Sequence, residues 1–332
     1  MHPHKLAAGA LVAMAALQSP ALALEAPKVS ALLTGWYTFD RNAPDAFTLR
    51  RVNLYFSGDV TPELSYAVMI NPAKSPALPT VSLAPGEPVP GVTVSNSGDT
   101  KILQDAVMTA KLAGGWKASM GQFRPPVSAE ALNPASRIPL AKRALFLEGN
   151  SFGFYRDLGL QVSGPLFPGL STTVGVFNGH GSNQLETNHQ KDVAGRLDYA
   201  PMSALKLGAS YLRGGRGASA TFTERIGANA AAELGPLQLS GEVLGGSDGP
   251  VQRLGWYGQG LWTFTPTVNA VLRFEEWDAD QAQAGKQQNT TLGVNWALSG
   301  ASKVAVNLIH EEVSGSAPRS NDLGLVLWQL ML

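Results

Sequence analysis

An alternation of apolar and polar side chains with a period of two residues constrains the fold of this chain more than any other feature. In the segment 268–276, Leu272 and Phe274 alternate with Arg273 and Glu275. Segments far from it in the chain repeat the pattern: 64–70, 290–298 and 303–312. Because successive side chains of a β-strand point to opposite faces, this period predicts strands with one apolar and one mixed polar face.

Across the whole chain the pattern predicts sixteen strands, an even number. Their expected ranges are 31–39, 47–58, 63–71, 101–112, 116–123, 157–164, 171–179, 192–199, 205–214, 221–234, 237–247, 254–264, 267–277, 289–298, 303–313 and 322–332. Tilted strands of about 9 to 11 residues can cross a bilayer, and a spanning sheet must close because every backbone polar group needs a partner. The predicted fold class is an all-β, transmembrane antiparallel β-barrel.

The connections between these strands alternate between two kinds. The short ones are 59–62, 113–115, 165–170, 200–204, 235–236, 265–266 and 299–302. The intervening ones are mostly longer and more polar, including 71–100, 124–156, 180–191 and 278–288. A soluble sandwich or propeller has no reason to keep its short turns at one end, whereas bacterial outer-membrane barrels have short periplasmic turns and long external loops. The connections therefore favour the bacterial outer membrane.

The first 23 residues have the features of a cleaved secretory signal peptide. Lys5 precedes an apolar run over residues 6–17, and Ala21 and Ala23 are the small residues of a cleavage site. A membrane anchor is the weaker alternative, because the run is shorter than the roughly 20 residues that span a bilayer. We expect export and a mature barrel formed by residues 24–332.

Composition narrows the class of partner. The chain has 25 basic and 25 acidic residues and is formally neutral, so no nucleic-acid partner is predicted. It contains no cysteine, which excludes disulfides and thiol-bound metals, and no cofactor is expected.

The longest connection, 124–156, interrupts the strand pattern. Four prolines prevent a regular strand there, at positions 125, 126, 134 and 139, and Ser128 precedes residues suited to a helical turn. A barrel of sixteen strands encloses open water rather than packed side chains. We therefore expect this connection to fold inward as a constriction loop.

Three stretches resemble the phosphate-selective porins of the porin O and porin P type. They are LRRVNLYFSGDVTPELSYAVMIN (49–71), GQFRPPVSAEAL (121–132), which is the most specific, and RDLGLQVSG (156–164). The resemblance implies a homotrimeric porin in outer-membrane lipid that passes small inorganic anions, such as phosphate, or other small solutes through a basic constriction. The chain differs from the family in ending on Leu332 instead of an aromatic residue.

The candidate anion path consists of basic residues on the loop and on the expected lumen faces. They are Arg51, Arg124, Arg137, Lys142, Arg143, Arg156, Lys111, Arg196, Arg225 and Arg273. Within the loop we expect Arg137, Lys142 and Arg143 to be exposed as an anion filter, since channels select ions with charge at a narrow point. The alternative is that the loop charges only hold the loop against the wall through salt bridges.

Arg50 and Arg51 are adjacent, so a regular strand sends their side chains to opposite faces. With Val52 and Leu54 on the lipid face, Arg51 is expected in the lumen and Arg50 near the outer rim. Both can line the pore only if the strand contains a bulge.

Two other classes of function stay open. One is a barrel enzyme of the protease or lipase type, with His310 beside Glu311 as a base or Asp278 with Asp280 as a cation site. The sequence places no nucleophile near these residues, so we do not predict an enzyme. The other is a structural barrel without a conducting path, and the open lumen of sixteen strands favours conduction instead.

Overall fold

The computed structural model describes residues 26–74, 80–83, 92–95, 101–148, 152–153, 155–217 and 219–332. The signal peptide expected at residues 1–23 lies outside the described residues. None of the described helices is long and apolar enough to cross a membrane.

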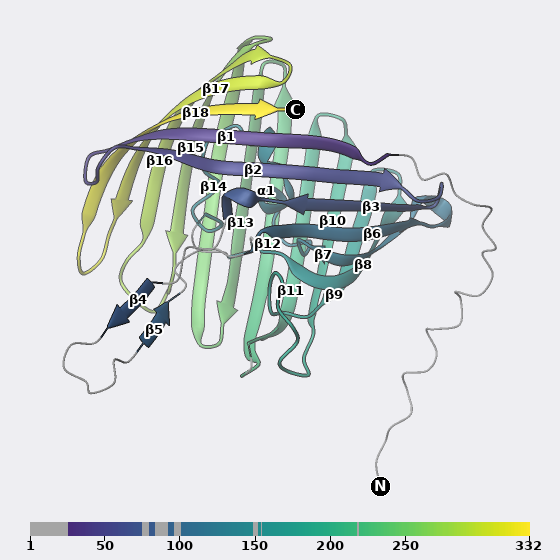
Figure 1. Ribbon diagram of the computed structural model, residues 1–332. Coiled ribbons are helices and arrows are strands. Elements are labelled where there is room, and N and C mark those ends of the chain that lie inside the picture. Colours follow the sequence, from purple (N-terminus) through teal and green to yellow (C-terminus); the bar gives the residue numbers. More distant parts are fainter. Residues whose placement is uncertain are drawn as a thin grey trace.

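Sixteen strands form one closed antiparallel barrel (Figure 1). In chain order they are β1 (Lys28–Asp40), β2 (Ala46–Asp59), β3 (Leu64–Ile70), β6 (Leu103–Lys111), β7 (Lys117–Phe123), β8 (Asp157–Phe167), β9 (Leu170–Phe177), β10 (Asp192–Met202), β11 (Leu205–Arg216), β12 (Thr221–Leu234), β13 (Leu237–Asp248), β14 (Val251–Thr265), β15 (Val268–Asp278), β16 (Gln287–Ser299), β17 (Ser302–Val313) and β18 (Arg319–Met331). Each overlaps one of the ranges expected from the alternation, so the predicted fold class is confirmed.

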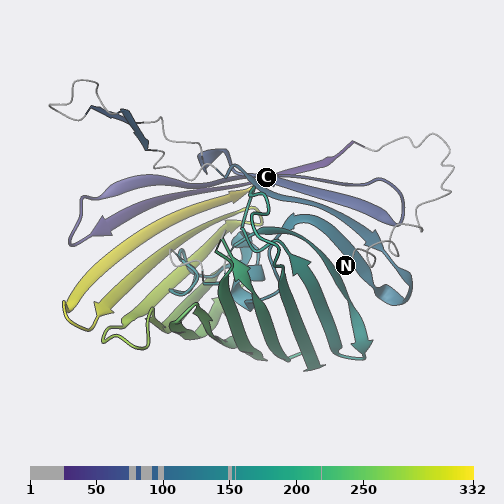
Figure 2. The ribbon, with the colours of Figure 1, turned by 90° about the horizontal axis from the view of Figure 1, so that it is seen from below.

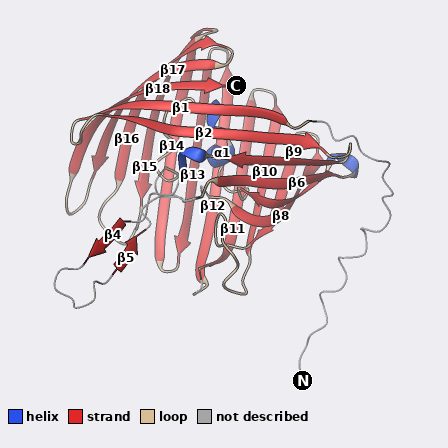
Figure 3. Cartoon of the chain, viewed as in Figure 1, coloured by secondary structure: helices blue, strands red, loops and turns tan. Residues whose placement is uncertain are grey.

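The other elements lie in the connections between barrel strands (Figure 3). They are η1 (Pro72–Lys74), β4 (Thr80–Leu83), β5 (Val92–Ser95), η2 (Ala113–Gly115), α1 (Ala129–Leu132) and η3 (Ala135–Arg137). β4 and β5 pair only with each other. The Ser128 hydroxyl accepts a hydrogen bond from the Ala131 N–H at 3.1 Å, so the expected helical turn is present and is capped at its start.

The barrel closes where the first strand pairs with the last. β1 and β18 run antiparallel from the pair Leu32 and Met331 to the pair Asp40 and Leu323. The last residue takes part, because the N–H of Ala31 donates to the Leu332 carbonyl at 2.8 Å and the N–H of Leu332 donates back at 2.9 Å. Closure leaves no unpaired strand edge for the lipid to cover.

The two faces of the sheet differ as the alternation predicts. On β15, Leu272 and Phe274 are 43% and 49% exposed, whereas Arg273 and Glu275 are 1% and 6% exposed. The apolar side chains face outward, towards lipid, and the polar ones face the interior. Some aromatic residues of the strands lie on the inner side instead, where Trp36, Tyr257 and Trp277 are buried.

The connection between β7 and β8 packs against the inner wall. Its residues Ala144 and Phe146 join an apolar cluster with Leu212, Leu244 and Trp277 of the wall. On another side, Ala141 packs in a second apolar cluster with residues of β1, β17 and β18. Viewed with the barrel turned by 90°, the connection lies within the ring of strands (Figure 2).

Candidate functional site: a basic cavity beside the loop

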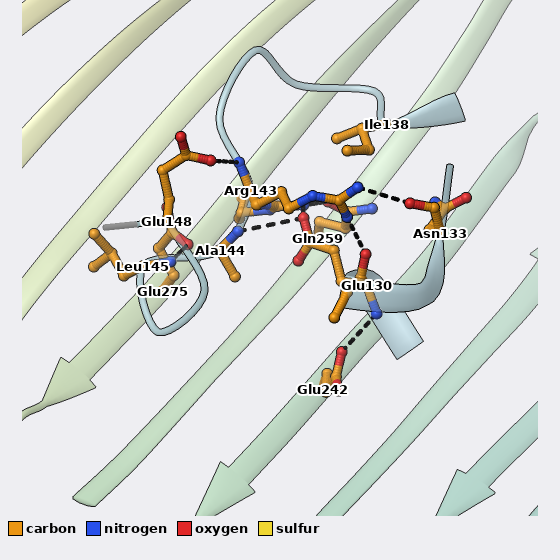
Figure 4. Close-up of polar contacts among 12 residues, drawn as sticks. Glu130, Asn133, Ile138, Arg143, Ala144, Leu145, Glu148, Glu242, Gln259 and Glu275 are labelled. Atoms are coloured by element: carbon orange, nitrogen blue, oxygen red, sulfur yellow. Dashed lines mark hydrogen bonds and ion pairs between the residues drawn. The ribbon is translucent and has the colours of Figure 1, made fainter. Parts of the chain in front are cut away.

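Wall carboxylates hold the backbone of the connection between β7 and β8. The two oxygens of Glu242 accept hydrogen bonds from the N–H groups of Ala129 and Glu130 at 2.9 and 3.0 Å, and Glu275 accepts one from Leu145 at 2.9 Å (Figure 4). Hydrogen bonds to an ionised acceptor are stronger than those between neutral groups. These contacts fix the first turn of α1 to β13 and the segment around Leu145 to β15, the two strands that flank β14.

Arg143 holds the same connection together from within. Its guanidinium donates to the Glu130 carbonyl and, at 2.7 Å, to the Asn133 carbonyl, and its side chain is only 2% exposed (Figure 4). Arg273, from the wall, pairs with the Glu130 carboxylate at 3.0 Å. Both arginines therefore support the shape of the loop, and the expectation that Arg143 is exposed is wrong. Its guanidinium fills a space between two loop segments.

A cavity of about 300 Å³ lies between the connection and the wall formed by β2, β3 and β6. We call it the basic cavity. Its six cationic side chains are Arg50, Arg51, Lys74, Arg124, Arg143 and Arg156, and its two carboxylates are Asp105 and Glu148. Six positive and two negative charges leave a net charge of +4. This set includes four of the ten predicted path residues and adds Arg50 and Lys74, which the pattern did not identify.

A β-bulge brings Arg50 and Arg51 to the same cavity. Thr34 of β1 pairs with Arg51 and the next residue, Gly35, pairs with Leu49, so Arg50 is the extra residue. Its guanidinium lies 5.0 Å from the centre of the Trp36 ring and forms an ion pair with Glu148. The expectation that Arg50 points to the outer rim is wrong, because a bulge re-aims the side chains that a regular strand would separate.

The cations of the basic cavity differ in their partners. Arg156 makes a two-pronged ion pair with Asp105, at 2.8 and 3.1 Å, and Arg124 donates to the Ala131 carbonyl at 2.8 Å. Arg51 is different: no residue in the described ranges forms a hydrogen bond or an ion pair with its guanidinium. Its five donors are therefore available to an ion in the cavity.

Burial and crowding act on the charges of this site. Burial, followed by the neighbouring guanidinium groups of Arg156 and Arg143, lowers the pKa of Arg124 to about 9. Burial likewise lowers the pKa of Arg143 to about 10. Both values lie above neutral pH, so the cavity keeps its positive charge under physiological conditions.

A second, larger cavity of about 580 Å³ lies on the other side of the segment 132–137. We call it the mixed cavity. Three predicted path residues line it: Arg137, Arg196 and Arg273. Arg137 is exposed, as expected, whereas Arg196 is held by Asp198 at 2.7 Å. Leu132 lines both cavities, so the ridge formed by this segment separates two spaces within the barrel.

The remaining three predicted residues lie away from both cavities. Lys142 is half-buried and pairs with Glu311 at 3.3 Å. Arg225 is 1% exposed and lies 3.9 Å from the centre of the Phe152 ring. Lys111 is exposed at the end of β6, where it donates to the Pro62 carbonyl at 2.9 Å.

The sequence matches one family over nearly all of the barrel. The family model described as phosphate-selective porin O and P matches residues 34–215 and 207–326. The chain belongs to this family. It is therefore a porin of the bacterial outer membrane, a barrel through which small hydrophilic solutes diffuse, as the resemblance implied.

Solved structures of other porins and channels share the fold at low sequence identity. The anion-selective porin from Comamonas acidovorans is 13% identical with a TM-score of 0.64, over 92% of this chain and 99% of that one. The outer membrane channel DcaP of Acinetobacter baumannii is 9% identical with a TM-score of 0.63, over 92% and 97%. The trimer form of OmpT of Vibrio cholerae is 9% identical with a TM-score of 0.63, over 93% and 100%. No curated protein matches this porin in sequence.

The residues considered for catalysis form rim contacts in this porin. The His310 ring bonds to Asp322 at 2.8 Å and to Glu312 at 3.1 Å, both of them exposed carboxylates. Asp278 accepts the N–H of Asp280 at 3.2 Å, as in a turn. Among the described residues, no group of three or more His, Asp or Glu side chains is arranged to hold a metal ion.

Proposed function

We propose that this porin conducts small anions, phosphate among them, through the basic cavity, and that the connection 124–156 is the constriction of the pore. The two apolar clusters occupy other parts of the interior, whereas the basic and mixed cavities lie on either side of the ridge 132–137. An anion that crosses the barrel would pass from one cavity to the other beside Leu132.

The charge of the basic cavity supports a preference for anions. At the effective dielectric constant of about 20 found near protein surfaces, one unit charge at 4 Å contributes about 4 kcal/mol, and the cavity has a net charge of +4. Channels use such groups of Lys or Arg at a narrow point to favour anions over cations. The solved porin from Comamonas acidovorans is itself described as anion-selective.

The observation that carries this proposal is the position of Arg51. Its guanidinium lines the basic cavity, and no partner among the described side chains satisfies its donors. A guanidinium fits the oxygens of a phosphate with two parallel hydrogen bonds. We infer that Arg51 binds the anion during its passage, while Arg143 and Arg273 hold the constriction in shape.

The test is the zero-current potential of the purified porin in a planar bilayer under a KCl gradient, repeated with phosphate present. We expect an anion-selective potential and a chloride current that phosphate reduces. Arg51→Gln should raise the half-blocking phosphate concentration about tenfold, the loss expected for one charge-assisted contact. Lys111→Gln removes the same charge outside the cavity and is the control.

Each other outcome has a definite meaning. A wild-type channel without ion preference and without phosphate block would leave a general porin and refute the anion proposal. An absence of channels would favour the structural barrel. Equal effects of Arg51→Gln and Lys111→Gln would show that net charge, and not the cavity, sets the preference.

We also infer that this porin is a homotrimer surrounded by outer-membrane lipid and that it is not an enzyme. The solved OmpT with the same fold occurs in a trimer form, and the outward side chains are apolar, as lipid requires. Light scattering of the detergent-solubilised protein, corrected for detergent, tests the trimer: a protein mass of a single chain would refute it.

A further inference from the structure

The carboxylate of Glu148 occupies a place that an anion would take. It lines the basic cavity and forms an ion pair with Arg50, and its other oxygen accepts the N–H of Arg143 at 3.3 Å (Figure 4). Carboxylate and phosphate oxygens meet a guanidinium in the same geometry. Arg50 is therefore already bound to an anionic group that belongs to the chain.

We propose that Glu148 is a tethered competitor, which occupies the anion position at Arg50 and is displaced when a phosphate-like anion enters. The inference rests on the proposed anion function and adds to it the residue that limits how tightly the anion is held. An incoming anion would bridge Arg51, whose donors are available, and Arg50, whose donors face Glu148. The Glu148 carboxylate would then turn towards water in the cavity.

The exposure of the ion pairs indicates which one can be displaced. The side chains of Arg50 and Glu148 are 38% and 20% exposed, so water screens this pair and its net stability is small. By contrast, the guanidinium of Arg156 is held at two points by Asp105, and its side chain is 9% exposed. The pair between Arg273 and Glu130 is more buried still, at 1% and 4%.

Arg50 has a second contact, with an aromatic ring, that is independent of Glu148. Its guanidinium lies on the Trp36 ring, 5.0 Å from the ring centre, and this contact does not involve the carboxylate, so it can hold Arg50 when Glu148 leaves. Displacement of Glu148 therefore requires only the rotation of a glutamate side chain. A channel must bind its ion well enough to admit it and weakly enough to release it, and an internal competitor lowers the affinity in this way.

The test is the phosphate concentration that halves the chloride current in wild type, Glu148→Gln and Glu311→Gln channels. Glu148→Gln keeps an oxygen for the Arg143 N–H but removes the charge, so we expect the half-blocking concentration to fall about fivefold, as for the loss of one partly exposed ion pair. Glu311 is the matched control: it pairs with Lys142, its side chain is 21% exposed, and it does not line the basic cavity. We expect less than a twofold change there.

A second comparison separates competition at Arg50 from charge alone. In the Arg50→Gln background, Glu148→Gln should lower the half-blocking concentration less than it does in wild type, because the position for which the two anions compete is gone. An equal effect in both backgrounds would overturn the proposal.

The remaining outcomes are also decisive. A half-blocking concentration that stays unchanged or rises in Glu148→Gln would refute the competitor, even in a wild-type channel that phosphate blocks. A wild-type channel that phosphate does not block would instead refute the anion function on which the inference rests. The two failures are therefore distinguishable.

Discussion

At the scale of single residues, two arginines that line the same cavity differ in function because their hydrogen-bond partners differ. Arg143 donates to the carbonyls of Glu130 and Asn133. Arg51 lines the same cavity, but its guanidinium forms no hydrogen bond or ion pair with any residue that the structure describes. A guanidinium whose donors are directed to backbone oxygens positions the loop, and one with unused donors can bind an ion. Arg143 and Arg51 should therefore respond differently to the same substitution.

We expect Arg143→Gln to widen the pore. Its removal leaves buried loop carbonyls without a partner, at a cost of about 1–3 kcal/mol to the docked loop. Single-channel conductance should rise and ion preference should fall together. Arg51→Gln should change preference with little change in conductance. A conductance in Arg143→Gln equal to that of wild type would contradict the positioning role.

At the scale of elements, the loop is held by the wall and not by its own secondary structure. α1 has four residues, too few to be stable alone, and its first N–H groups are bound by Glu242 of β13. A carboxylate near the start of a helix also interacts favourably with the partial positive charge there. The wall therefore determines where α1 forms.

Glu242→Ala should loosen this attachment. Loss of two charge-assisted hydrogen bonds costs the docked loop about 3 kcal/mol. Amide hydrogen exchange at Ala129 and Glu130 should become at least tenfold faster than in wild type, and the channel current should become noisier. Glu233→Ala, at an exposed position on the neighbouring β12, is the control and should leave the exchange rates unchanged. Equal protection in Glu242→Ala and wild type would show that other contacts dock the loop.

At the scale of the whole molecule, the barrel depends on its closing strands. Leu332 has no aromatic ring, yet its backbone forms two hydrogen bonds with Ala31 next to the pair Leu32 and Met331. Leu332 therefore takes part in closing the sheet through its backbone.

Deletion of residues 331–332 should lower the fraction of folded barrel, because it exposes the edge of β1 to lipid. Leu332→Phe keeps the backbone pairs and should fold at least as well as wild type. The heat-modifiable mobility of the protein on gels measures both. A deletion variant that folds like wild type would show that closure does not depend on these last pairs.

Export remains a prediction at this scale. The mass of the mature protein should correspond to a chain that begins at Leu24, because cleavage is expected after Ala23. A mature chain that retains Lys5 would contradict the signal peptide.

Much of the barrel follows from the sequence alone. The alternation in strands such as β15 determines which side chains face lipid, and the number of alternating segments gives the number of strands. A sheet inside a bilayer must close, because every backbone polar group there needs a partner. The adjacent arginines at positions 50 and 51 and the proline-rich connection were also visible as unusual features.

The tertiary structure decided which charges form the site. A regular strand places Arg50 outward, and only pairing with β1 creates the bulge that turns it inward. Arg143 resembles an exposed cation in the sequence, yet the fold of the connection buries it against two carbonyls. Such outcomes depend on contacts between residues far apart in the chain, and a local pattern contains no information about them.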